Sequence, residues 1–167
     1  GMEPLAEDFR YQSSSEIRSD TPWGQVPIRH LSHEEVEIFL IDRHHSDLTG
    51  KRTPPHNINY RANVHAAKSL DPDLIISVNS VGTMVEDFPP GSVGLVSDVL
   101  DLSSRPMTFF DDVATHADRT SCFSEYHMEK IKQYPERGLS TFTGIVSAQS
   151  SGPQFETPAE ITALRAL

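Results

Sequence analysis

The sequence predicts an α/β fold in which helices flank a layered, mainly parallel sheet. Short runs of branched and aromatic residues alternate along the chain with segments of helical spacing, as in layered α/β domains. One run, residues 74–78, is almost continuously apolar, which is typical of a strand buried on both faces. Polar residues directly follow two of the runs, where parallel strands commonly hold ligands.

The N-terminal part is polar and interrupted by proline and glycine. Gly1 precedes Met2 and is interpreted as the scar of an expression tag. Residues 1–20 are predicted to form an irregular segment, and irregular structure is expected to continue to residue 35, with at most a short edge strand at 26–28. A single domain is predicted over residues 21–167.

The middle of the chain contains the first firm elements. Residues 36–41 are branched or aromatic except for one acid, which predicts a strand. Residues 60–70 carry alanine and leucine at helical spacing, and the helix should end before Pro72. A strand over residues 74–78 follows.

The C-terminal part continues the alternation. We predict strands over residues 93–102 and 141–148, with a polar loop at 103–121 and a helix at 125–134 between them. The last helix should begin with a capping box, because Thr157 is followed by proline and then, three residues on, by Glu160.

Composition excludes several classes of function. The chain has 167 residues and 24 acids against 14 bases, a net charge of −10 that disfavours nucleic acid or an anionic membrane as a partner. Neither a leader nor an apolar run of about 18 residues is recognisable. The single cysteine, Cys122, rules out an intrachain disulfide, so a soluble protein of the reducing cytoplasm is expected.

Arg43 and His44 are the first candidate site residues, because they follow the strand at 36–41. A guanidinium fork suits phosphate oxygens, and an imidazole adds a second donor. Between Arg43 and Arg61 there are four bases and one acid, 4 − 1 = +3 within an acidic chain, which a bound anion would explain. A solvated loop without function is the alternative.

Asn79 and Ser80 are the second candidates, following the strand at 74–78. Small polar residues near Gly82 allow backbone N–H groups and hydroxyls to approach an anion. An ordinary turn at the end of a strand would have the same composition.

Phe155 and Glu156 are the third candidates, between the last predicted strand and the last helix. The ring could stack on a planar base, and the carboxylate could accept hydrogen bonds from ring N–H groups. Core packing for Phe155 and a helix-dipole role for Glu156 are the alternatives.

A metal site and a serine hydrolase are both disfavoured. The eight histidines include pairs at 30 and 33 and at 44 and 45, but no cysteine or carboxylate completes a known ligand spacing. The Gly-x-Ser-x-Gly elbow of serine hydrolases does not occur.

Taken in order, these stretches resemble the trimeric purine nucleoside phosphorylase family, in its methylthioadenosine and methylthioinosine phosphorylase branch. The resemblance covers roughly residues 20–167, and the stretch from Pro54 to Asn63 (PPHNINYRAN) is its most specific part. The supporting matches are Thr21-Pro22-Trp23-Gly24, Arg43-His44, Val78-Asn79-Ser80-Val81-Gly82, Pro90-Gly91, Gly152-Pro153-Gln154-Phe155-Glu156-Thr157 and Ala159-Glu160.

The resemblance implies phosphorolysis of a purine nucleoside, without metal or organic cofactor and with inorganic phosphate as co-substrate. It implies catalytic and phosphate-binding roles for Arg43 and His44, and phosphate binding by Asn79 and Ser80. It implies purine binding by Phe155 and Glu156, the carboxylate favouring a 6-oxopurine because adenine has no N1–H to donate.

The family pattern extends beyond this sequence. Its glycine-rich phosphate loop has no counterpart before Thr21, its later Met-Ser/Thr-x-x-Pro-Glu motif would follow residue 167, and residues 45–53 are extra. The sheet is therefore expected to be incomplete at both ends and, with bare edges, to assemble as a homo-oligomer. The alternatives are a truncated, inactive homologue that binds phosphate or purine, and an unrelated nucleotide-binding module with Arg43 and Phe155 far apart.

Overall fold

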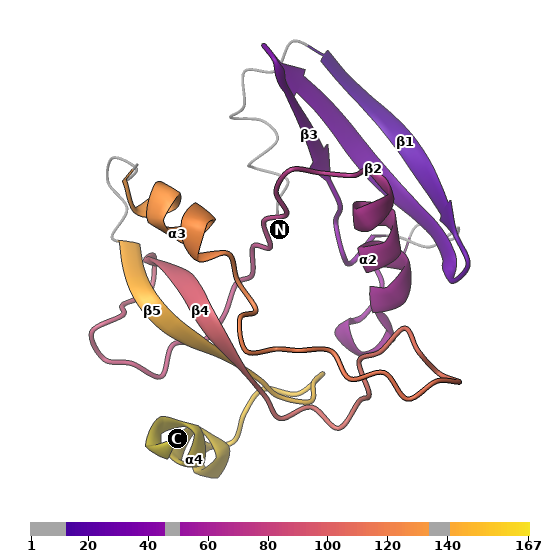
Figure 1. Cartoon of the computed structure of the whole chain (residues 1–167). Coiled ribbons are helices and arrows are strands. Elements are labelled where there is room, and N and C mark those ends of the chain that lie inside the picture. Colours follow the sequence, from indigo (N-terminus) through magenta and orange to yellow (C-terminus); the bar gives the residue numbers. More distant parts are fainter. Residues whose placement is uncertain (1–12, 46–50, 134–140) are drawn as a thin grey trace. The chain divides into compact units, whose positions relative to one another are not determined.

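The computed structural model shows mixed α/β structure and describes residues 13–45, 51–133 and 141–167 (Figure 1). The chain divides into two compact units, Gly1–Val78 (unit 1) and Asn79–Leu167 (unit 2). Three strands come first and helices alternate with strands from residue 60 onward, which confirms the predicted α/β class. The prediction of a single domain stays a prediction. In the ranges described, no helix has the length and apolar character needed to cross a bilayer.

Unit 1 contains a three-stranded sheet of order β1-β2-β3, formed by β1 (Ser13–Thr21), β2 (Gly24–His33) and β3 (Val36–Leu40). Both pairings are antiparallel, which differs from the mainly parallel arrangement that we expected. The strand predicted at 36–41 is confirmed as β3.

Two predictions for the N-terminal part are wrong. Residues 13–20 belong to β1 rather than to an irregular segment, and β2 is a long central strand rather than a short edge strand. Alternating burial is typical of a strand, and Val26 and Ile28 are both buried in β2. Pro27 lies between them and obscures this alternation in the sequence. Pro27 is tolerated because β3 pairs with β2 only from Arg29 onward, so β2 has one neighbour at the proline.

Helix α2 (Tyr60–Ser69) packs against this sheet and confirms the predicted helix. Asn59 caps it by accepting a hydrogen bond from the backbone N–H of Ala62 at 3.1 Å. The core joins Ala62 and Ala66 of the helix to Val26 and Ile28 of β2. A short 3-10 helix, η1 (Pro55–Asn57), precedes α2.

The apolar run at 74–78 is not a strand, contrary to prediction. The segment has no regular secondary structure, and its large apolar side chains are exposed, Ile76 to 65%. An apolar run is a buried strand only where neighbouring strands and covering layers exist. Among the residues that the structure describes, no strand pairs with this segment.

Unit 2 is built on a parallel pair, β4 (Val93–Asp101) and β5 (Thr141–Gln149), as predicted. Helix α3 (Glu125–Lys132) follows the predicted loop, and residue 134 lies outside the described residues. Helix α4 (Pro158–Ala166) begins at the predicted capping box.

Candidate functional site

The turn that follows β3 holds Arg43 and His44 in place through Asp42. The Asp42 carboxylate accepts a hydrogen bond from the backbone N–H of His44 at 3.0 Å. The backbone N–H of His45 donates to the Asp42 carbonyl at 2.8 Å. Aspartate commonly folds the backbone back in this way, so the tight turn is explained by a local side-chain contact.

His44 is tied to the far side of the loop by Thr53. Its Nδ1 lies 2.9 Å from the Thr53 carbonyl, and the Thr53 N–H donates to the His44 carbonyl at 3.2 Å. A carbonyl can only accept, so Nδ1 must carry the proton. Nε2 is then the ring nitrogen left for a ligand, and it donates to an anion only when the ring is charged.

Asn63 of α2 holds the same turn through its side-chain amide. This side chain is 8% exposed, and its amide group donates to the Arg43 carbonyl at 3.4 Å. Its oxygen lies 3.2 Å from Nε2 of His45, while Nδ1 of His45 is buried with no partner in the described ranges. Asn63 was not a predicted site residue. The sequence feature that could have identified Asn63 is a polar residue on the same buried helix face as Ala62 and Ala66.

The predicted surplus of positive charge is partly neutralised. Arg52 forms an ion pair with Asp42 at 2.9 Å, in which both side chains are about half exposed. The guanidinium of Arg43 is exposed and makes no hydrogen bond or ion pair with any described residue. It is therefore open to an anion.

Asn79 and Ser80 lie at the start of unit 2, in an irregular and exposed segment. They follow the apolar run directly, as the sequence indicated, but that run is not a strand. Their role in phosphate binding stays a prediction.

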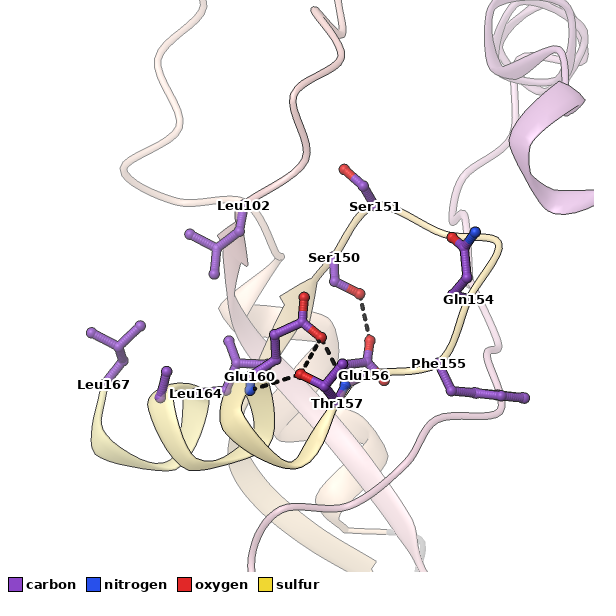
Figure 2. A pocket seen from close by; sticks show the side chains of 11 residues that line it. Leu102, Ser150, Ser151, Gln154, Phe155, Glu156, Thr157, Glu160, Leu164 and Leu167 are labelled. Atoms are coloured by element: carbon purple, nitrogen blue, oxygen red, sulfur yellow. Dashed lines mark hydrogen bonds between the residues drawn. The ribbon is translucent and has the colours of Figure 1, made fainter.

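A cavity of about 450 Å³ lies beside the loop that joins β5 to α4 (Figure 2). Phe155 and Glu156 both line it, together with Ser150 from the end of β5 and apolar side chains of α4. The structure therefore brings the two predicted purine-binding residues to one hollow within unit 2. The convergence of Arg43 and Phe155 on a shared cleft stays a prediction.

Glu156 is held by a short hydrogen bond that the Ser150 hydroxyl donates to its Oε1. This bond, with a second from the Glu156 backbone, holds the pKa of the Glu156 carboxyl below its ordinary value, although burial opposes the effect. The carboxyl group is thus kept as an acceptor-only carboxylate at neutral pH.

Phe155 is 96% exposed, and in Figure 2 its ring extends away from the Ser150–Glu156 pair. Core packing, the alternative considered for this residue, is therefore wrong for the described structure. A fully exposed ring next to a hollow is available to stack on a planar ligand.

The described ranges contain no group of three or more His, Cys, Asp or Glu side chains that could hold a metal. Three of the four histidines in the pairs at 30 and 33 and at 44 and 45 make other contacts in the structure. His30 contacts Glu37 and stacks on Phe39, while His44 and His45 hold the turn. The expectation that the reaction needs no metal stays a prediction.

Known structures share this fold. A double mutant of adenosine/methylthioadenosine phosphorylase from Schistosoma mansoni, in its apo form, superimposes with a TM-score of 0.72 at 22% identity. The match covers 95% of this chain and 62% of that one. Methylthioadenosine phosphorylase from the same organism, in complex with tubercidin, gives a TM-score of 0.72 at 21% identity, over 95% of this chain and 64% of that one.

Curated relatives are similar in sequence. A probable S-methyl-5′-thioinosine phosphorylase of Methanopyrus kandleri is 37% identical over 150 residues, 88% of this chain and 57% of the relative. A probable 6-oxopurine nucleoside phosphorylase of Moorella thermoacetica is 34% identical over 157 residues, which are 91% of this chain and 59% of the relative. This chain therefore spans a little under three-fifths of their length.

The Phosphorylase superfamily, as a sequence family, matches residues 1–167. The relatives above agree with the branch that the motifs indicated, and the resemblance is confirmed. On this evidence the chain belongs to the Phosphorylase superfamily.

Proposed function

We propose that the protein carries out phosphorolysis of a purine nucleoside or 5′-methylthionucleoside, releasing free purine and ribose or methylthioribose 1-phosphate. The observation that carries the proposal is the ionised Glu156 carboxylate beside the exposed ring of Phe155 in one cavity. The names of the relatives, thioinosine and 6-oxopurine nucleoside phosphorylases, support it.

Glu156 would select the base. A carboxylate only accepts hydrogen bonds, and a 6-oxopurine presents N1–H, whereas adenine presents an unprotonated N1 at neutral pH. Adenine would place two acceptors against each other in the cavity, an unpaired contact that costs affinity. The proposed purines are therefore hypoxanthine and guanine rather than adenine.

Arg43 and His44 would hold the phosphate, with Asn79 and Ser80 as further phosphate ligands. As the bond to the base breaks, the ribosyl carbon gains positive charge, and the phosphate dianion both stabilises that charge and attacks it. The open guanidinium of Arg43 and a charged His44 would place the anion in line, without a metal or organic cofactor.

The test is release of hypoxanthine from inosine and methylthioinosine, with and without inorganic phosphate. We expect phosphate-dependent release, and a loss of about ten- to a hundredfold in kcat/KM for Glu156→Gln, because the hydrogen-bond acceptor loses its charge. Glu129→Gln, on the exposed surface of α3, is the matched control and should behave as wild type. The absence of phosphate-dependent release by the wild type would refute turnover.

The second candidate function is binding without turnover by an inactive member of the family. Calorimetry separates the two functions: heat of binding for hypoxanthine or phosphate with no product would favour the inactive protein.

We also propose a homo-oligomer in the cytoplasm. The apolar side chains of residues 74–78 are exposed, and β4 and β5 each pair on one side only among the described strands. The one cysteine, Cys122, fits a reducing compartment. Light scattering tests the assembly, and a monomer would contradict it.

A further inference from the structure

The cavity in unit 2 contains two carboxylates, and one of them is already in use. Oε2 of Glu160 accepts from the Thr157 backbone N–H at 2.7 Å and from the Thr157 hydroxyl at 2.9 Å. These bonds form half of the capping box that starts α4 (Figure 2). Glu160 is therefore committed to the helix, and Glu156 is the carboxylate that a ligand can use.

Glu156 receives a hydrogen bond from one other side chain. Ser150 donates to Oε1, and Oε2 has no hydrogen bond from another side chain within the part of the chain that the structure describes (Figure 2). The two oxygens of this carboxylate therefore differ in their side-chain contacts. Oε1 is tied to Ser150, and Oε2 keeps lone pairs for a donor that enters the cavity.

Ser150 itself is anchored by the sheet. It directly follows Gln149, the last residue of β5, whose carbonyl accepts from the backbone N–H of Leu102 at 2.9 Å. The hydroxyl therefore links a loop residue, Glu156, to the ordered end of the parallel pair. A loop carboxylate without such a link would sample several rotamers and lose entropy on binding.

We propose that Ser150 is a positioning residue for base recognition: its hydroxyl fixes Glu156 so that Oε2 accepts from a ring N–H of a 6-oxopurine. The inference rests on the proposed function and adds to it a residue that touches the carboxylate rather than the purine.

Removal of the hydroxyl has a predictable consequence for pH dependence. The Ser150 bond is the largest cause of the lowered pKa of the Glu156 carboxyl, and Glu160 on α4 is the other titratable group that lines the cavity. In Ser150→Ala the Glu156 pKa rises toward its ordinary value. Protonation then removes the acceptor at a higher pH than in wild type.

The experiment is calorimetric titration with hypoxanthine across the acid range for wild type, Ser150→Ala and Ser150→Thr. We expect Ser150→Ala to bind about tenfold more weakly at neutral pH and to lose binding at a higher pH, because a charge-assisted hydrogen bond is removed. Ser150→Thr keeps the hydroxyl and should restore both properties. Ser147→Ala, in β5 and outside the cavity, is the matched control and should match wild type.

A second measurement needs no ligand. Titration of ¹³C-carboxyl-labelled glutamate by NMR, with the Glu156 signal assigned from Glu156→Gln, should show a higher pKa for Glu156 in Ser150→Ala than in wild type. If the wild type binds hypoxanthine and Ser150→Ala has the same affinity, pH profile and Glu156 titration, the inference is overturned and the proposed function survives. If the wild type binds no hypoxanthine at any pH, both fall.

Discussion

Unit 1 carries the Arg43 turn and unit 2 carries the Glu156 loop, and the two units support these candidate residues in different ways. Every residue that is buried among those described lies in unit 1, including Ile28 with no exposed surface and the polar Asn63. Unit 2 has none, and its apolar side chains, such as Val146 at 59%, are largely exposed. The Arg43 turn therefore rests on a core, whereas the Glu156 loop rests on surface hydrogen bonds.

The difference has a physical origin in the two sheets. An antiparallel sheet with one face packed on a helix needs only one covering layer, and α2 supplies it for unit 1. A parallel pair is stable only when both faces are covered and further strands flank it. The described residues of unit 2 offer β4 and β5 few such partners, so this unit is the one that depends on assembly or further chain.

The largest expected effect is on the core of unit 1. Ile28→Ala should lower the free energy of unfolding by about 2–5 kcal/mol, because it deletes a fully buried side chain. Val146→Ala in unit 2, the matched control, should change it by no more than about 0.5 kcal/mol. Trp23 is the only tryptophan and packs on the core, so its fluorescence during urea unfolding measures the free-energy loss in Ile28→Ala. Circular dichroism follows the unfolding of both variants. Equal losses would contradict the contrast between the units.

An intermediate effect on the free energy of unfolding is expected at Asn63, which holds the Arg43 turn. Asn63→Ala leaves the Arg43 carbonyl and the His45 ring without their buried partner, which should cost about 1–3 kcal/mol. Urea unfolding measures the loss, and phosphate binding should weaken with it if Arg43 holds the anion. Val64→Ala, the exposed neighbour on the same helix, is the control. Identical behaviour of the two variants would show that Asn63 does not fix the turn.

The smallest expected effect is an acid sensitivity of unit 2. Four carboxyl groups with a lowered pKa, Asp101, Asp118, Glu156 and Glu160, all lie there, mainly because serine and threonine groups donate hydrogen bonds to them. A lowered pKa means that the folded unit binds protons less readily than the unfolded chain. This contribution is full above the ordinary pKa values of Asp and Glu, and it is lost as the pH falls through the lower pKa values of the folded unit.

Hydrogen exchange at neutral pH and in acid, corrected for intrinsic rates, checks this prediction unit by unit. Protection of β4 and β5 should fall more than protection of β2 and α2. Ser103→Ala removes the leading cause of the lowered pKa of Asp101 and should reduce the pH dependence of unit 2. A larger acid loss in unit 1 would reverse the comparison.

Local signals in the sequence predicted most of the elements. Helices α2 and α4 were predicted from spacing and caps, and Thr157 and Glu160 form the capping box as expected. The strands β3, β4 and β5 followed from short branched and aromatic runs. These features depend on neighbours within a few residues, so a local pattern is sufficient.

Two errors arose where partners distant in the sequence decide the outcome. The β2 segment looked irregular because Pro27 masked the alternation of apolar and polar residues. The proline is tolerated because β3 ends before it reaches Pro27, so no ladder hydrogen bond to β3 is lost there. Residues 74–78 looked like a buried strand, but a strand also needs a neighbour, and none of the described strands pairs with it. Asn63 was missed as a site residue because its two partners lie 18 and 20 positions away.

The sequence alone determined the family and the class of fold, and it nominated the candidate site residues, because motifs and periodicity are properties of the chain itself. Tertiary structure alone decided which of those residues are free to act. It paired Arg52 with Asp42 and left Arg43 open, and it committed Glu160 to a helix cap while Ser150 turned Glu156 toward the cavity. Hydrogen bonds and ion pairs between side chains depend on distances that only the folded chain fixes.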